Sequence, residues 1–152
     1  MTVVRVTEEP LDTGRELDSL PDDAERGAVV TFTGQVRGDG GLTALTLEHY
    51  PGMTEKQLHA IAETAAARFG LSDVRVAHRV GRMTRGDTIV IVVTAAPHRQ
   101  AAFDGAAFLM DWLKTKAPFW KREDGHWGHR WVDARESDDR AAERWSQKSG
   151  EA

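Results

Sequence analysis

Apolar residues alternate with polar ones in several short segments of the chain, at the two-residue period of a half-buried β-strand. Segments 2–7, 27–36 and 74–80 show this alternation. Segment 88–96 is apolar at almost every position, which predicts a strand buried on both faces. Two further short strands are expected, at 119–123 and 130–134.

A Gly-Asp-Gly-Gly run at residues 38–41 separates strand segment 27–36 from another strand-like segment, 42–49. Glycine-rich runs of this kind favour a reversal of the chain. The simplest prediction is therefore a β-hairpin between the two segments.

Two longer segments repeat apolar residues every three or four positions, as amphipathic helices do. In segment 54–69, Thr54 and Gln57 have the spacing of a capping box, and Gly70 can end the helix. Segment 97–116 begins with a proline suited to a first helical turn, and Pro118 ends it. The residues expected to face the core from this second helix are Phe103, Ala106, Ala107, Met110 and Leu113. A shorter helix is expected within residues 10–20, where Thr13 and Glu16 have capping-box spacing.

This order of strands and helices predicts an α+β fold with a mixed or antiparallel sheet and two main helices. A length of 152 residues suits one domain with a real core, which we place at residues 1–145, followed by a frayed tail at 146–152. The composition, 40% hydrophobic and 29% charged, is that of an ordinary globular protein.

The longest apolar run, 89–96, is far shorter than the roughly 20 residues that a membrane helix requires. The N-terminal residues also lack the basic region and apolar stretch of a secretory signal. We therefore expect no membrane partner and a cytoplasmic location.

The chain contains no cysteine, which excludes disulfides, thiolate metal sites and cysteine nucleophiles. Any sulfur chemistry must take its sulfur from another molecule. The formal charge of −4 argues against a general nucleic-acid coat. The basic residues are nevertheless clustered, because residues 111–122 hold four cations against one acid.

His98 and Arg99 follow Pro97 at the start of a predicted helix, where cations oppose the positive end of the helix dipole. A helix N-terminus with free N–H groups beside Arg and His is suited to an anion. The alternative is that both side chains point into solvent or pair with acids such as Asp104.

Lys114 lies one turn after Met110, at the border of the predicted apolar face, where it could be half-buried. A chain reversal after Pro118 could bring Lys121 back beside it. Neighbouring cations lower the pKa of a lysine and make it a better base or nucleophile. The alternative, a solvated basic helix end, is favoured for Lys116. Arg37 ends a strand at the glycine turn, where it either reaches a ligand or is simply solvated.

His126 and His129 lie near two acids at a spacing that a metal could use, but no third ligand is evident, so we expect no metal. His78, on an apolar strand face, is expected to be a hydrogen-bonded core residue. Glycines form neither a dinucleotide nor a phosphate-loop motif, and we expect no cofactor.

Three long segments carry a resemblance to a known family. They are 27–37 (GAVVTFTGQVR), 45–54 (LTLEHYPGMT) and 109–123 (LMDWLKTKAPFWKRE). Shorter matches occur at 78–81, 86–87, 97–99 and 130–136 in the same order. Over about residues 3–145 the chain resembles the large, catalytic subunit of molybdopterin synthase.

The resemblance implies an α/β-hammerhead fold with an added antiparallel subdomain. It also implies a sulfurtransferase that forms a homodimer, with a small ubiquitin-like sulfur-carrier subunit on each copy, giving a heterotetramer. The carrier's Gly-Gly tail ends in a thiocarboxylate. Two such sulfurs convert cyclic pyranopterin monophosphate into the dithiolene of molybdopterin.

Site residues follow from the same resemblance, by matching position. Lys114 and Lys121 match the two catalytic lysines. The anion-binding set around the phosphate and pterin is Arg37, His98, Arg99 and Arg135, and Phe32 and Met110 match apolar residues of the pocket. The chain departs from the family pattern in the loop 37–42, which is shorter than in some relatives, and at 124–129.

Two other functions remain open at this stage. One is a non-catalytic module that holds a carrier tail or a phosphorylated pterin without turnover. The weaker one is a single-stranded RNA binder, because Trp120 stands beside Lys121 and Arg122.

Overall fold

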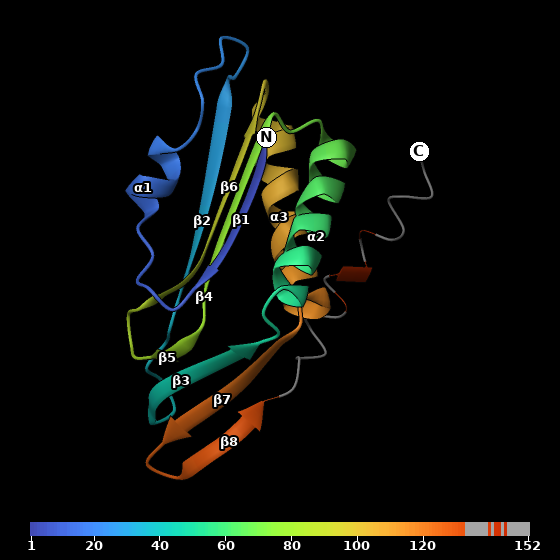
Figure 1. The fold of residues 1–152 in the computed structure, drawn as a ribbon. Helices are drawn as coiled ribbons and strands as arrows, with labels where there is room; N and C mark the ends of the chain where they lie inside the picture. Colours follow the sequence, from blue (N-terminus) through green and yellow to red (C-terminus); the bar gives the residue numbers. More distant parts are fainter. Residues whose placement is uncertain (133–139, 141, 144, 146–152) are drawn as a thin grey trace.

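The computed structural model describes residues 1–132, 140, 142, 143 and 145, and residues 1–132 form two sheets and three helices (Figure 1). In chain order the elements are β1 (Thr2–Thr7), α1 (Thr13–Asp18), β2 (Ala28–Gln35), β3 (Leu42–His49), α2 (Met53–Phe69), β4 (Asp73–Arg79), β5 (Gly81–Met83), β6 (Thr88–Ala96), α3 (Arg99–Lys116), β7 (Phe119–Gly125) and β8 (Gly128–Val132). The predicted α+β class is confirmed.

The first sheet has the strand order β1-β4-β6-β2. β1 runs parallel to β4, and the other two pairs are antiparallel. Helices α2 and α3 lie side by side over one face, and α1 lies on the other side (Figure 1). The main core fills the space beneath the two long helices and includes Leu58, Phe108, Leu109, Val76 and Val92.

The opposite face of β4 and β6 is also buried. Ala77, Ile91 and Val93 form a small second layer there, against Leu11 and Leu20 from the chain on either side of α1. The prediction that segment 88–96 is a strand buried on both faces is therefore confirmed.

The second sheet has the order β5-β3-β7-β8 and extends from the end of the first sheet (Figure 1). Its own small core contains Leu45, Leu47, Val80 and Met83, together with Val36 from the end of β2. Val36 therefore anchors the end of the first sheet in the second one.

The predicted hairpin between 27–36 and 42–49 is wrong. β2 pairs with β6, with Phe32 opposite Val92, while β3 pairs with β5 and β7. Because β6 is apolar on both faces, it takes a central position with a neighbour at each edge. The glycine run 38–41 carries the chain from one sheet to the other instead of reversing it.

The predicted core face of α3 is confirmed at Ala106 and Leu113, which are buried, and is wrong at Phe103. Phe103 is 56% exposed, whereas Ala102, Gly105, Phe108 and Leu109 are buried. A Cβ atom at Gly105 would lie 2.7 Å from Leu71 Cδ1, so a larger residue there would require the Leu71 side chain to move. Phe103 lies on the exposed side of the helix, while the large Phe108 and Leu109 fill the core beside the small Ala102 and Gly105.

The helix boundaries also correct two predicted caps. Asp12, not Thr13, caps α1, since its carboxylate accepts from the N–H groups of Gly14 and Arg15. In α2, the capping contact is from the Gly52 N–H to Glu55, while Thr54 is fully buried. The predicted end of α2 is confirmed, because Gly70 adopts φ of 68° at the C-cap.

Trp145 belongs to the main core and is 3% exposed. Its indole N–H donates to Asp111 Oδ2 at 2.6 Å, and Arg68 donates to its carbonyl oxygen at 2.8 Å. The predicted domain limit at residue 145 stays a prediction, and the tail at 146–152 lies outside the described residues. Among the helices that the structure describes, none is long and apolar enough to cross a membrane.

Candidate active site

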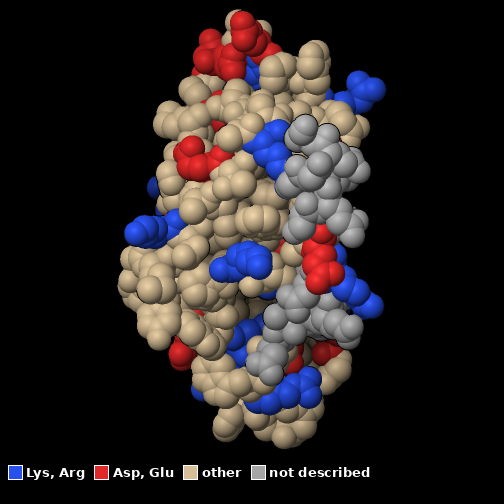
Figure 2. Space-filling view, turned by 90° about the vertical axis from the view of Figure 1, so that its right-hand side faces the viewer, with Lys and Arg blue, Asp and Glu red and all other residues tan. Residues whose placement is uncertain are grey.

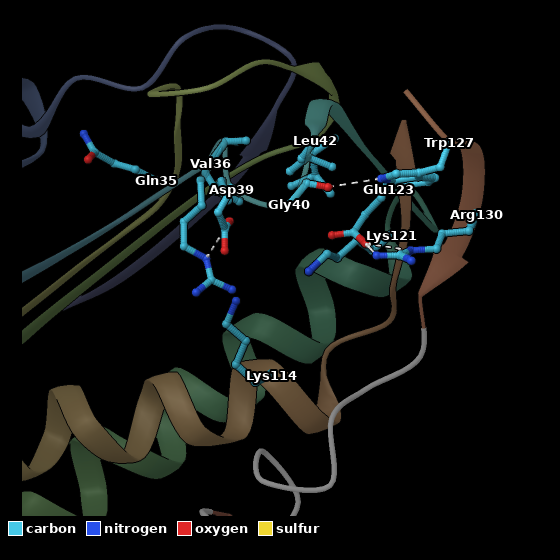
Figure 3. A pocket seen from close by; sticks show the side chains of 13 residues that line it. Gln35, Val36, Asp39, Gly40, Leu42, Lys114, Lys121, Glu123, Trp127 and Arg130 are labelled. Atoms are coloured by element: carbon cyan, nitrogen blue, oxygen red, sulfur yellow. Dashed lines mark hydrogen bonds and ion pairs between the residues drawn. The ribbon is translucent and has the colours of Figure 1, made fainter. Parts of the chain in front are cut away.

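A cleft of about 380 Å³ opens where the two sheets and the C-terminal end of α3 meet (Figure 3). Five segments line it. They are the end of β2 with its following loop, β3 through Leu42 and Leu45, β6 through Ile89, the last turn of α3, and the β7–β8 hairpin. The residues that carry charge in its lining are Arg37, Asp39, Lys114, Lys121, Glu123 and Arg130. Four cations against two carboxylates favour a negatively charged ligand.

Lys114 and Lys121 both line the cleft, from α3 and β7 respectively (Figure 3). The chain reversal expected after Pro118 is present, and the Pro118 carbonyl oxygen accepts a hydrogen bond from Thr54 Oγ1 at 3.2 Å. Lys114 is exposed, not half-buried, and Lys121 is partly buried. Lys116, for which the sequence favoured a solvated role, is exposed and does not line the cleft.

β7 sets the direction of Lys121 by its alternation. Phe119 packs against the core of the second sheet, so Lys121 and Glu123, two and four residues further on, share its face. Phe119 is held by stacking on His78, with ring centroids 4.0 Å apart. The start of the strand that carries Lys121 is therefore fixed by packing.

Arg37 follows β2 after one residue, Val36, and lines the same cleft. Its Nε lies 3.9 Å from Asp39 Oδ1, and both side chains are mostly exposed. An exposed pair at this distance contributes little stability, so Arg37 can exchange Asp39 for an incoming anion at small cost.

The far side of the cleft is formed by residues that the sequence analysis did not assign to the site. Arg130 Nη2 lies 3.1 Å from Glu123 Oε1, and its guanidinium lies 4.3 Å from the centre of the Trp127 ring. The contact between Glu123 and Arg130 cannot be read from their spacing in the sequence, because it arises from their pairing across the β7–β8 hairpin. Only the register of the hairpin reveals it.

His78 lies just behind the cleft. Burial lowers its pKa to about 4 against the opposing effect of its hydrogen bond to Arg79, and the nearby charge of Lys114 acts in the same direction as burial. Its Nδ1 lies 3.0 Å from the Arg79 carbonyl oxygen. The expectation of a hydrogen-bonded core histidine is confirmed.

His98 and Arg99 stand at the opposite end of α3. Arg99 and Lys114 are 15 positions apart, which corresponds to about 22 Å along the helix axis. Both residues are exposed, and neither lines the cleft. Asp104, the acid considered as their partner, accepts a hydrogen bond from Gln100.

The remaining predicted site residues do not line the cleft within the part of the chain described. Phe32 is 40% exposed on β2, and Met110 is partly buried against the main core. Arg135 lies outside the described residues. His126 and His129 are exposed, and the described residues contain no cluster of three potential ligands that could hold a metal.

Charge is distributed unevenly over the molecule. In Figure 2 several basic side chains lie in the lower part of the face, toward the second sheet, whereas acidic side chains crowd the upper end. The fold and the cleft together define an α+β protein with a predominantly cationic cleft between a helix end and a small antiparallel sheet.

Comparison with known proteins identifies the family. The profile of the MoaE protein family matches residues 6–116, and the chain belongs to this family. It is 52% identical over 148 residues to the molybdopterin synthase catalytic subunit of Escherichia coli (strain K12), covering 95% of this chain and 98% of that protein.

Solved structures agree with this assignment. The fold is similar to the molybdopterin biosynthesis MoaE protein from Burkholderia ambifaria MC40-6, with a TM-score of 0.84, 46% identity, and coverage of 96% and 99% of the two chains. It is also similar to a chain in the complex of subunits 1 and 2 of the molybdopterin-converting factor from Helicobacter pylori 26695 (TM-score 0.73, 21% identity, coverage of 87% and 91%), a likeness in fold alone.

Proposed function

We propose that this chain is the catalytic subunit of a molybdopterin synthase. It transfers two sulfurs from a thiocarboxylated carrier subunit to cyclic pyranopterin monophosphate and so forms the dithiolene of molybdopterin. The observation that carries the proposal is the convergence of Lys114, Lys121 and Arg37 in one cationic cleft. The family membership supports the same activity.

The cleft suits both anions of this reaction. The carrier tail ends in a thiocarboxylate, and the substrate bears a phosphate. Once the sulfur has bonded to the pterin, release of the tail requires a nucleophile, water or Lys114, to add to the tail's carbonyl carbon. This addition places negative charge on the carbonyl oxygen. The charge leaves the oxygen when the carbon–sulfur bond breaks, and the sulfur stays on the pterin as a thiolate. Donors that are already in place stabilise such charge, and one of them is typically worth roughly 10²–10³ in rate.

We assign Lys114 to the carbon of the thiocarboxylate, as a base or as a transient acyl acceptor. We assign Lys121 to the substrate phosphate, which it orients and neutralises. The chain itself has no cysteine, so both sulfurs arrive with the carrier. Its Gly-Gly tail suits a narrow approach to the lysines, because glycine has no side chain.

A second copy of the chain would give a role to Phe32, His98 and Arg99, which do not line the cleft of their own chain. β2 is an edge strand of the first sheet, and Phe32 and Phe103 are 40% and 56% exposed beside it. An edge strand with exposed aromatic residues favours association with another protein surface. Within one chain, Arg99 stands about 22 Å along the helix axis from Lys114 in the cleft. In a homodimer we place His98 and Arg99 at the cleft of the neighbouring copy instead.

We therefore propose a heterotetramer of two such chains and two carriers, acting in the cytoplasm, with Met110 and Arg135 contributing to the same substrate pocket. Deleting the carrier's last two glycines should abolish activity and leave part of the binding, since the carrier's folded body has its own interface. Size-exclusion chromatography with light scattering, run with intact and truncated carrier, measures the assembly. A monomer that binds no carrier would contradict it.

The test of the activity is incubation with cyclic pyranopterin monophosphate and thiocarboxylated carrier, followed by detection of the two-sulfur product. Carrier with an ordinary carboxylate and free sulfide without carrier are the controls. Complex formation without dithiolene would favour the non-catalytic binding module. Equal product from free sulfide alone would overturn the carrier's role.

A further inference from the structure

Trp127 lies in the turn of the β7–β8 hairpin and contacts a loop that is distant in the sequence. Its indole N–H donates to the Gly40 carbonyl oxygen at 3.2 Å (Figure 3). Gly40 belongs to the glycine loop, residues 38–41, which follows Arg37. The hydrogen bond therefore joins two segments that both line the cleft.

The two segments fit closely where they meet. A Cβ atom at Gly125 would lie 2.7 Å from Trp127 Cε2 and 2.8 Å from the Gly41 carbonyl oxygen. A side chain at position 125 would thus push the ring and the loop apart. Gly41 has φ of 78°, a conformation that residues with a side chain rarely adopt. Glycines on both sides of the contact allow this approach.

The Trp127 ring is also held from within the hairpin. The Arg130 guanidinium lies 4.3 Å from the ring centre, a cation–π contact. Arg130 is in turn fixed by Glu123, whose side chain is 15% exposed. The ring is therefore positioned by β7 and β8 independently of the glycine loop.

The other contacts of the glycine loop lie outside the hairpin. The Asp39 carbonyl oxygen accepts from the Leu42 N–H at 3.3 Å, and the Asp39 carboxylate lies 3.9 Å from Arg37 Nε. Gly38 packs against Arg85, where a Cβ atom would lie 2.6 Å from Cδ.

Three of the loop's four residues are glycine, and all four are exposed. Among the described residues, the bond from Trp127 to Gly40 is the hydrogen bond that connects residues 38–41 to the hairpin. A glycine-rich exposed segment without such a bond samples many conformations.

We propose that Trp127 is a positioning residue that latches the glycine loop to the hairpin and so presents Arg37 to the cleft before the substrate arrives. Its catalytic consequence rests on the proposed function, whereas the latch itself does not. Lys114 and Lys121 stand on α3 and β7, outside the latched loop. Loss of the latch should therefore weaken substrate capture more than the chemical step.

Three variants test this. Trp127→Ala removes the ring, and Trp127→Phe keeps a ring for Arg130 and the glycines but removes the N–H donor. Trp131→Ala is the matched control, because Trp131 is a 55% exposed indole of the same hairpin that does not line the cleft. Amide ¹⁵N relaxation of Gly40 and Gly41 reports the loop, and steady-state kinetics with the phosphorylated pterin reports the site.

In Trp127→Ala, the order parameters of Gly40 and Gly41 should fall from about 0.85 to below about 0.6, and KM should rise about tenfold with a smaller change in kcat. Trp127→Phe should fall between this variant and the native chain, and Trp131→Ala should match the native chain. Unchanged order parameters in Trp127→Ala would overturn the latch, and a mobile loop with unchanged KM would overturn its positioning role. A native chain that makes no product would refute the proposed function, while the relaxation data would still decide the latch.

Discussion

The two ends of α3 both carry cations, but they stand in opposite relation to the helix dipole. At the C-terminal end, Lys114 and Lys116 lie in the last turn, where positive charge stabilises the helix. At the N-terminal end, Arg99 begins the helix, His98 caps it without a side-chain hydrogen bond, and the first turn has no acid. The helix dipole therefore favours the two lysines at the C-terminal end and disfavours the cations at the N-terminal end.

The difference separates two kinds of functional residue. A lysine at the C-terminal end needs no special explanation, so its role must be argued from what it faces, and Lys114 faces the cleft while Lys116 does not. Cations at the N-terminal end work against the helix, and for this reason we propose an anionic ligand for them. Position along the dipole and position relative to the cleft are independent evidence.

The largest expected effect concerns the C-terminal end. Lys114→Ala should lower sulfur transfer by about 10²–10³-fold, because it removes a preorganised cation from the developing charge. The fold should be retained, since an exposed lysine contributes little packing. Initial rates of product formation measure the loss, and circular dichroism measures the fold.

Lys116→Ala is the matched control, since it removes a lysine two positions away that does not line the cleft. Lys121→Ala should also lose most activity. A greater loss in the Lys116 variant than in the Lys114 variant would show that the cleft face of α3 is misassigned.

The next effect concerns His78 and the pH dependence of the stability of the fold. His78 has its pKa lowered to about 4 from the ordinary 6.5, so between these values the unfolded chain binds a proton that the folded chain does not. Its contribution to stability is therefore full above pH 6.5 and is lost as the pH falls toward 4. Between pH 7 and pH 4.5 the expected loss is about 2 kcal/mol.

Urea unfolding of the native chain and of His78→Gln at both pH values measures this contribution. The glutamine variant should lose less stability on acidification, because its side chain does not titrate. Equal losses in both proteins would assign the acid sensitivity to other groups.

Some of this could be predicted from the sequence. The burial of β6 on both faces follows from its composition, and the approach of Lys121 to Lys114 follows from the break at Pro118. Local pattern determines such features, because a continuous apolar strand must be covered on both sides and a proline interrupts a helix.

Nonlocal pairing was beyond the sequence. A glycine run marks a change of direction without specifying the partner strand, so the pairing of β2 with β6 was missed. The Glu123–Arg130 pair depends on hairpin register, and the Trp127–Gly40 bond joins residues 87 positions apart. Phe103 was misplaced because a hydrophobicity pattern cannot detect that Gly105 brings the helix close to Leu71.

A smaller effect on function is expected at the N-terminal end of α3. His98→Ala and Arg99→Ala should each weaken binding of the phosphorylated pterin about tenfold and leave carrier binding unchanged, since each removes one charge-assisted contact to an anion. Isothermal titration calorimetry with each ligand separately checks this. Unchanged pterin affinity in both variants would leave this end of the helix without a role in the substrate site.

The smallest effect tests the dipole argument without any ligand. If Arg99 opposes the helix dipole, Arg99→Ala should stabilise the unliganded protein by about 0.3–1 kcal/mol, because it removes an unfavourable charge from the first turn. Lys116→Ala, at the favourable end, should destabilise it by a similar amount. Both changes should shrink at high salt, because exposed charges are screened. Urea unfolding at low and high ionic strength measures them. A loss of stability in Arg99→Ala would mean that Arg99 stabilises the fold, and the dipole argument would be wrong.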